Sequence, residues 1–451
     1  MRSTLFYGTL PCTLGIFQAL DFDRVANISK VLPPSQDSFY HVPKDITNFE
    51  PGEVIRHRNT PSPIGAFGIS AEKYVQNSYQ LLYRTINSKK TPTATVITVL
   101  VPINPDFGKI VSLETAEDAA SIDCAPSFGF QSASSSYPRL SSPTTELQVL
   151  VAQDLLHRGW IVVVPDFQGP KGEYPAGEMG AYASLDGIRA TLSSGGLTGV
   201  KEDAKIALWG YSGGASVSLS TVQAMPSYAR ELNIVAASFG GTIGSAVGLS
   251  SNQKISFLNG SDDVFIIVIA ILGKAAVDDE FEKKVVKNLK PNFRHAFLQA
   301  KHECLDFIKD RFRKQDILSM FKDAGFVTSI DYPEPIFKDV APTVPMYWYQ
   351  SDLDTLTPTR LAEATAKKLC DEGAHIHFVV DAVPNVTHAS FSVYGTERSL
   401  DWLDKAFNGG NFSTGCSQER IRTREVPSAF TDLFPPNIQA AVRAFAESND
   451  G

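Results

Sequence analysis

The chain has 451 residues, of which 43% are hydrophobic and 20% charged, as in an ordinary globular protein. Its net charge of -8 excludes nucleic acid as the main partner, because no basic stripe offsets the acidic excess. The longest apolar run, Val264 to Leu272, is far shorter than the roughly 20 residues that cross a membrane, so it predicts a buried or cap helix.

The N-terminus carries a weak leader pattern. Arg2 precedes an apolar stretch from Leu5 to Leu20, although Pro11 interrupts it and no small-x-small cleavage site follows. We expect residues 1–20 to be a signal peptide and the protein to be secreted. Three N-x-S/T sequons are candidate glycosylation sites, at Asn27, Asn259 and Asn411.

Cysteine usage points in the same direction. Without Cys12, which lies in the leader, the chain keeps an even number of cysteines, at positions 124, 304, 370 and 416. An even count is compatible with disulfides in an oxidising compartment. There is no CxxC pair, so a zinc ribbon is not expected. We expect neither a metal ion nor an organic cofactor.

The first half of the chain alternates between strand and helix patterns. Residues 21–90 are expected to form an N-terminal extension with a helix near Ala71 to Asn87. Thr95 to Pro102 is a β-branched run and predicts a strand, and Ser132 to Pro143 predicts a surface loop. Thr145 to His157 has helical periodicity, and Trp160 to Val164 is typical of a strand buried on both faces.

The second half continues the alternation around a helical insertion. Further strands are predicted at Lys205 to Trp209, Asn233 to Ser238, Val344 to Tyr349 and His375 to Val380. This order predicts an α/β fold with a mostly parallel sheet, formed by residues 91–250 and 336–415. Residues 251–335 are helix-rich and charged, and predict a cap. Residues 416–451 form a tail that ends in an amphipathic helix, Pro436 to Glu447.

A nucleophile elbow is the clearest chemical motif. Residues 210–214 fit G-x-S-x-G, with a predicted strand before the motif and a helix of small residues after it. In such a turn the serine is exposed, and small flanking residues let the helix pack close to the strand. Ser212 is therefore the candidate nucleophile, and the backbone N–H of Gly213 can point at a developing oxyanion.

A serine needs a base to take its proton, and His388 is the candidate. It lies in a loop after the last predicted strand, where the α/β-hydrolase order of serine, acid, histidine places the base. His375 and His377 share one face of a strand and are expected to be structural. A fourth sequon, at Asn385, lies so close to His388 that a glycan would obstruct the site, so we expect little or no glycan there.

The acid has three candidates on the residues alone. Asp352 and Asp354 follow one predicted strand, and Asp381 follows the next. Each would lie at the carboxyl edge of the sheet, where site residues gather in α/β folds.

These residues resemble the fungal secretory lipases, the family of Candida antarctica lipase A. The resemblance runs from roughly Thr95 to Cys416 and rests on the stretches DCAPS (123–127), LDGIRA (185–190), GYSGGA (210–215) and ELNIV (231–235). It implies the α/β-hydrolase fold. The family pattern of Asp, three residues and Pro falls on Asp354 to Pro358, which favours Asp354 as the acid.

The resemblance carries further expectations. The family histidine falls on His388, and its oxyanion-hole aspartate is expected at Asp166, with Gly213 as the second donor. The family cysteines imply two disulfides, Cys124–Cys304 and Cys370–Cys416. The cap differs from the family lipase, and the tail after Cys416 is shorter than the family flap, so the substrate is left open.

Four functions compete on these grounds. The leading prediction is a secreted lipase that cleaves acylglycerols or other apolar esters, with transient lipid contact through the cap. The second is a soluble esterase resembling the trichothecene deacetylases, which would act on a fungal secondary metabolite; a peptidase ranks behind both. The fourth candidate belongs to a different class, an inactive hydrolase fold used for binding; the presence of Ser212, Asp354 and His388 in the expected order argues against it.

Overall fold

The computed structural model describes residues 31–244, 251–330, 340–412 and 414–447. The expected signal peptide and the Asn27 sequon lie outside this range. Within it, the strands are β1 (Val54–Asn59), β2 (Gly65–Ala66), β3 (Ile69–Ser70), β4 (Val75–Ile86), β5 (Pro92–Pro102), β6 (Asp106–Glu114), β7 (Trp160–Pro165), β8 (Lys205–Tyr211), β9 (Ile234–Gly240), β10 (Met346–Ser351), β11 (Ile376–Asp381) and β12 (Ser417–Ile421).

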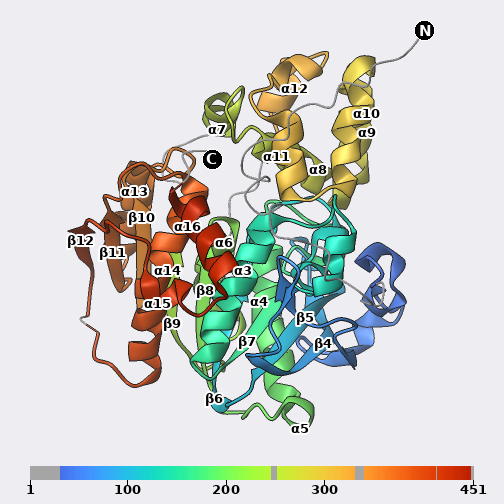
Figure 1. Cartoon of the computed structure of the whole chain (residues 1–451). Helices are drawn as coiled ribbons and strands as arrows, with labels where there is room; N and C mark the ends of the chain where they lie inside the picture. Colours follow the sequence, from blue (N-terminus) through green and yellow to red (C-terminus); the bar gives the residue numbers. More distant parts are fainter. Residues whose placement is uncertain (1–30, 245–250, 331–339, 413, 448–451) are drawn as a thin grey trace.

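Helices surround these strands (Figure 1). They are α2 (Pro126–Gly129), α3 (Pro143–His157), α4 (Gly177–Ser193), α5 (Gly195–Thr198), α6 (Gly213–Tyr228), α7 (Ser251–Leu258), α8 (Phe265–Val277), α9 (Asp279–Asn288), α10 (Pro291–Gln299), α11 (Leu305–Phe312), α12 (Ala324–Thr328), α13 (Thr359–Asp371), α14 (His388–Phe407), α15 (Ser428–Thr431) and α16 (Pro436–Glu447). No helix of the described part is both long enough and apolar enough to span a bilayer.

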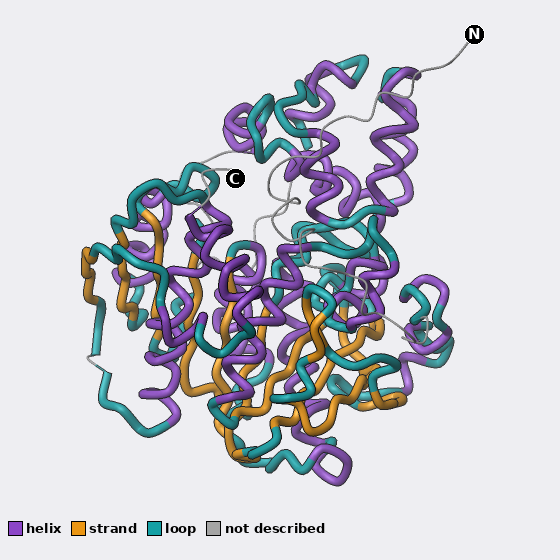
Figure 2. The backbone as a smooth tube through the Cα atoms, viewed as in Figure 1, coloured by secondary structure: helices purple, strands orange, loops and turns teal. Residues whose placement is uncertain are grey.

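One large sheet organises the described part, in the order β1-β4-β5-β7-β6-β8-β9-β10-β11-β12. All neighbouring pairs from β7 to β12 are parallel, and the three pairs at the β1 end are antiparallel. Helices cover both faces of the sheet, as Figure 2 shows. The central strands are accordingly apolar on both faces. Helices α3, α14 and α16 pack on one face, and α4, α6 and α13 pack on the other. This is the α/β-hydrolase architecture expected from the sequence.

The helix expected near Ala71 to Asn87 is wrong: these residues form the long strand β4. Tyr83 and its apolar neighbours are fully buried between β1 and β5, so strand pairing overrides the local helical spacing. The segment 21–90 thus contributes β1 and β4 to the central sheet. The tail likewise adds β12 to the far edge, parallel to β11.

The segment 251–330 forms helices α7 to α12, which gather at one end of the molecule in Figure 1. They enclose an apolar cluster of their own, centred on α8, whose residues are largely buried. The run Val264 to Leu272 is thus a buried cap helix, as expected. A 3₁₀ turn, Ala300–His302, separates α10 from α11 shortly before Cys304.

Candidate active site

Ser212 stands at a strained turn between β8 and α6. Its φ of 56° lies in the left-handed region, which a non-glycine residue seldom adopts. A Cβ at Gly214 would lie 1.8 Å from the backbone oxygen of Glu114, and one at Gly210 would lie 2.5 Å from the backbone of Gly214. Only glycine fits at these two positions, so the sequence GYSGG folds locally into the elbow expected of it.

His388 connects the elbow to the acid. Its Nε2 lies 2.7 Å from Ser212 Oγ, and its Nδ1 lies 2.7 Å from Asp354 Oδ2. His388 is the first residue of α14, which Thr387 caps through a capping box, so the backbone beneath the imidazole is fixed. The Tyr211 hydroxyl also donates a hydrogen bond to the His388 carbonyl, at 2.6 Å.

The Asp354 carboxylate is buried and held by three further donors, of which the Gln350 amide donates to Oδ2 at 3.5 Å. The backbone N–H of Thr357 donates to Oδ1 at 2.7 Å, and the Thr357 hydroxyl donates to Oδ2 at 2.6 Å. Burial raises the Asp354 pKa, but the charge and hydrogen bond of His388 outweigh it and the pKa falls below its usual value. Burial lowers the His388 pKa, and the attraction of Asp354 outweighs it, so that pKa is raised.

The rival acids lie elsewhere. Asp352 pairs with Arg420 at 3.3 Å. Asp381 accepts the backbone N–H of Thr423 at 2.8 Å and its hydroxyl at 2.6 Å. Of the three aspartates left open by the residues alone, Asp354 is the one that the fold brings to His388.

Asp166, the residue expected in the oxyanion hole, directly follows β7. Its backbone N–H donates to Val96 within the sheet at 2.9 Å. Its carboxylate accepts the backbone N–H of Ser127 at 2.8 Å and the Ser127 hydroxyl at 2.5 Å. Burial raises the Asp166 pKa to about 7. The backbone N–H and the carboxylate of Asp166 are thus both used in structural hydrogen bonds.

A second acidic residue, Asp118, lies beside the elbow. It follows β6, has a φ of 41°, and faces the elbow so closely that a Cβ at Gly213 would lie 2.2 Å from Asp118 Oδ1. Burial raises its pKa to about 6, against the pull of His388. Gly213 is the first residue of α6, so its N–H has no partner one turn earlier in the helix. Asp118 comes four residues after the end of β6, in the segment LETAED, and the sequence patterns did not predict that strand.

A cavity of about 600 Å³ opens onto Ser212, His388 and Asp118. On the core side, α3, α14 and the tail supply its walls. On the cap side its lining includes charged residues that pair with one another, Lys309 with Asp263 at 3.8 Å and Arg313 with Asp262. The cap side of the cavity is thus mixed, because apolar residues of the cap such as Phe257 and Phe265 line it beside these charged pairs.

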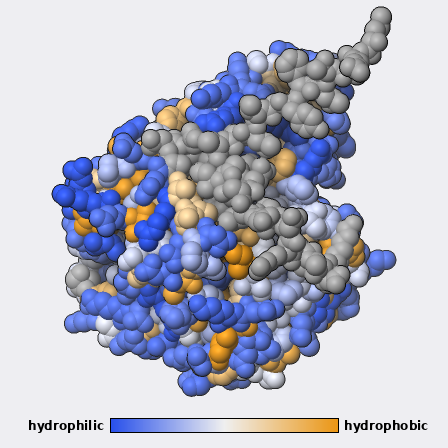
Figure 3. Space-filling view, in the orientation of Figure 1, coloured by the Kyte–Doolittle hydropathy of each residue, from blue (hydrophilic) through white to orange (hydrophobic). Residues whose placement is uncertain are grey.

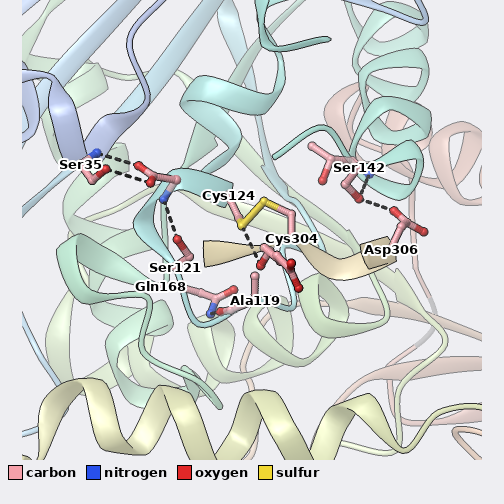
Figure 4. Close-up of a disulfide and its surroundings, with 11 residues drawn as sticks. Ser35, Ala119, Ser121, Cys124, Ser142, Gln168, Cys304 and Asp306 are labelled. Atoms are coloured by element: carbon pink, nitrogen blue, oxygen red, sulfur yellow. Dashed lines mark hydrogen bonds between the residues drawn. A yellow bond between two sulfur atoms is a disulfide. The ribbon is translucent and has the colours of Figure 1, made fainter. Parts of the chain in front are cut away.

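Both expected disulfides are present. Cys124–Cys304 joins the core to the cap, and Cys370–Cys416 joins α13 to the segment before β12. Figure 4 shows the first, with Asp306 of α11 accepting a hydrogen bond from the Ser142 hydroxyl nearby, at 2.6 Å. The cap is therefore fixed to the core at the start of α11.

No group of three or more potential metal ligands gathers within the described residues. His375 Nδ1 accepts the backbone N–H of Gly415 at 2.7 Å, and His377 Nδ1 lies 2.8 Å from the Ser417 hydroxyl. Both histidines thus hold the segment that leads into β12, which is a structural role. Asn259 is half-buried, and Asn411 and Asn385 are exposed.

Comparisons with known proteins agree with this geometry. The family model described as secretory lipase matches residues 136–415. Lipase A of Arthroderma benhamiae is 34% identical over 399 residues, covering 86% of this chain and 83% of the relative. Lipase 10 of Candida albicans is 30% identical over 451 residues, covering 96% and 92%. The structure of Candida antarctica lipase A in its closed state has a TM-score of 0.76 and 27% identity, covering 92% of this chain and 96% of that one.

Proposed function

The chain belongs to the secretory lipase family and is a carboxylic ester hydrolase, and on that premise we propose that it works through an acyl-enzyme on Ser212. The observation that carries the proposal is the chain of 2.7 Å contacts from Ser212 Oγ through His388 to Asp354. His388 takes the hydroxyl proton as Oγ attacks the ester carbonyl, and Asp354 stabilises the imidazolium that forms.

The tetrahedral intermediate then collapses. His388 returns its proton to the leaving alcohol oxygen, and the acyl group stays on Ser212 until a water molecule, deprotonated by the same imidazole, releases the acid. The N–H of Gly213 supports the oxyanion, and a donor of this kind is typically worth about 3 kcal/mol in the transition state. The Asp118 carboxyl group lies beside Gly213, and with a pKa of about 6 it is mostly ionised at the pH where His388 is the neutral base.

The substrate class that we propose is neutral, apolar esters such as acylglycerols. Support comes from apolar residues on the core side of the cavity and from two exposed hydrophobic residues in its lining, Phe257 of α7 and Leu353 after β10. Exposed apolar side chains at the rim of a site are suited to transient contact with a lipid surface. Elsewhere on the face in Figure 3, the described surface is mostly hydrophilic with small separate hydrophobic patches.

The charged pairs on the cap side favour a second candidate, a soluble esterase for a more polar ester such as an acetylated metabolite. Burying a long alkyl chain against Lys309 and Asp263 would cost more than burying it against apolar groups. Hydrolysis of esters with acyl chains of two to eighteen carbons separates the two. A lipase favours the long chains, whereas a deacetylase cleaves acetates and fails on the rest.

Secretion is part of the proposal. It is supported by the family description and by the two disulfides, which persist in oxidising compartments. Mass analysis of the protein in the medium and in the cells of the host tests secretion. We expect a chain in the medium that lacks residues 1–20, and a chain that stays in the cell with residues 1–20 attached would contradict secretion.

The test of the mechanism is Ser212→Ala, with Ser220→Ala in α6, the helix that follows Ser212, as the matched control. Ser212→Ala should fold and lose kcat by on the order of 10⁶. Ser220 donates its hydroxyl to the Ser216 carbonyl within α6, so its loss should leave the rate near wild type. Circular dichroism checks both folds. A folded Ser212→Ala enzyme with near-normal hydrolysis would refute the assignment.

A further inference from the structure

Part of the cavity lies against both α3 and α14, next to His388, and this part is called the branch below. On α14 the lining residues are 388, 389, 392, 393 and 396, and on α3 they are 143, 144, 147, 148 and 151. Both sets follow the spacing of a single helix face. Eight residues of α-helix advance about 12 Å, so the branch follows each helix for roughly that length.

The polar side chains of this branch are already hydrogen-bonded to the protein. Ser392 and Thr396 donate their hydroxyls to carbonyls of the preceding turn of α14, each at 2.7 Å. Gln148 accepts the N–H of Ala116 at 2.8 Å and donates to the Thr144 carbonyl at 3.2 Å. Trp209 donates its indole N–H to Ser399 at 2.8 Å. A ligand in this branch is therefore offered apolar surface rather than free hydrogen-bonding groups.

The tail contributes two aromatic side chains to the lining of the cavity. Phe430 of α15 and Phe445 of α16 both line the cavity, and both are buried in the core cluster that includes α3 and α14. Figure 1 shows α16 lying in front of α14 and close to α3. Arg443 fixes α16 on α15 by donating to the Thr431 hydroxyl at 2.7 Å, and Tyr74 donates to the Leu433 carbonyl at 2.6 Å.

The chemistry of ester cleavage says which half of the substrate lies there. His388 must give its proton to the leaving oxygen, so that oxygen lies against Nε2, and the atoms attached to it leave from the histidine side of the site. The branch begins at His388 and Ala389. We propose that it is the binding site for the leaving alcohol, that it selects apolar alkyl alcohols, and that Phe445 and Phe430 set their length.

The dimensions predict a cut-off. An extended alkyl chain advances roughly 1.25 Å per carbon, given C–C bonds of about 1.5 Å, so the branch holds about nine carbons. Within that length, kcat/KM should rise by up to about fourfold per methylene group, the value for full burial of a CH₂. This inference rests on the proposed ester hydrolysis, and goes beyond it by assigning the alcohol half of the substrate.

The experiment uses two substrate series with the full-length enzyme. One series is the acetates of n-alkanols with two to fourteen carbons, and the other is the ethyl esters of the matching acids. Phe445→Ala opens the end of the branch, and Leu147→Trp fills it near the middle. Ile438→Ala is the control, because Ile438 is buried in the same helix but lies outside the cavity lining.

For wild type, kcat/KM over the acetate series should rise and level off near nine carbons. Phe445→Ala should move that plateau by about three carbons toward longer alcohols, since truncation leaves a cavity. Leu147→Trp should flatten the dependence on alcohol length, and Ile438→Ala should keep the wild-type profile. In all variants the shape of the acid series should match that of wild type.

Two results would overturn the assignment. If Phe445→Ala and Leu147→Trp change the acid series and leave the alcohol series alone, the branch holds the acyl chain. If neither series changes in either folded variant, the branch does not bind substrate. Both results would leave the proposed function intact, because that function fails only if wild type lacks hydrolysis or Ser212→Ala retains it.

Discussion

Asp354→Asn should cripple the enzyme, because the surrounding hydrogen bonds decide how the new amide must lie. Oδ1 of Asp354 accepts a backbone N–H from Thr357, a donor that cannot reverse its role. The asparagine oxygen must therefore stay at that position, and its NH₂ group takes the place of Oδ2 facing His388 Nδ1. The Thr357 hydroxyl tolerates this change, since a hydroxyl can accept as well as donate.

The NH₂ group then donates to Nδ1, and the neutral imidazole carries its proton on Nε2. In that tautomer His388 cannot take the proton of Ser212, which lies 2.7 Å from Nε2. The expected loss is on the order of 10⁴ in kcat, or about 5 kcal/mol of transition-state stabilisation. The stability of the fold should change little, because the amide keeps its bond to Thr357.

The assay is ester hydrolysis by Asp354→Asn beside Asp352→Asn and Asp381→Asn. The Asp352 carboxylate contacts Arg420, and the Asp381 carboxylate contacts Thr423, so both controls should stay within a few-fold of wild type. If either control is crippled while Asp354→Asn is active, the acid is the other aspartate and the hydrogen-bond argument is refuted.

Three further predictions concern pH and stability. Protonated His388 cannot act as base, so kcat/KM should fall as the pH drops through a midpoint above the ordinary histidine pKa of 6.5. Asp354→Asn should lower that midpoint, because the variant loses the carboxylate charge that raises the His388 pKa. The same midpoint in wild type and Asp354→Asn would argue against the interaction of His388 with Asp354. Burial raises the Glu114 pKa to about 7, so the folded state binds the proton more tightly than the unfolded state. As the pH rises from 4.5 to 7, the free energy of unfolding of wild type should therefore fall by about 3 kcal/mol relative to that of Glu114→Gln. Urea titrations in which the difference between the two proteins stays constant over this range would contradict the prediction. Replacing Cys370 and Cys416 by alanine should lower the free energy of unfolding by about 4 kcal/mol, because the disulfide closes a loop with a 46-residue separation. The measurement is the midpoint of urea unfolding, and an unchanged midpoint would show that the crosslink adds no stability.

The sequence predicted the parts of the site that depend on local structure. The run Trp160 to Val164 and the strand before Ser212 are continuous apolar stretches, which a sheet covered on both faces requires. The elbow glycines and the position of His388 after the last predicted strand follow from chain order. These features were predictable because neighbouring residues encode them.

The misses depend on contacts between distant segments. The strand β4 is stabilised by pairing with β1 and β5, and no local periodicity shows that pairing. Asp118 follows a strand, β6, that the sequence patterns did not predict, so the sequence does not show that Asp118 faces Gly213. Nor does the sequence show that the tail helix α16 reaches the cavity.

The most direct test of the central claim is covalent labelling with a fluorophosphonate, followed by peptide mass analysis. The probe reacts with a serine only where a neighbouring base activates the hydroxyl. The account predicts one phosphonyl group per chain, on Ser212, with hydrolysis lost in proportion to labelling and no adduct in Ser212→Ala. An adduct on another serine that abolishes activity, or full activity with Ser212 completely labelled, would contradict it.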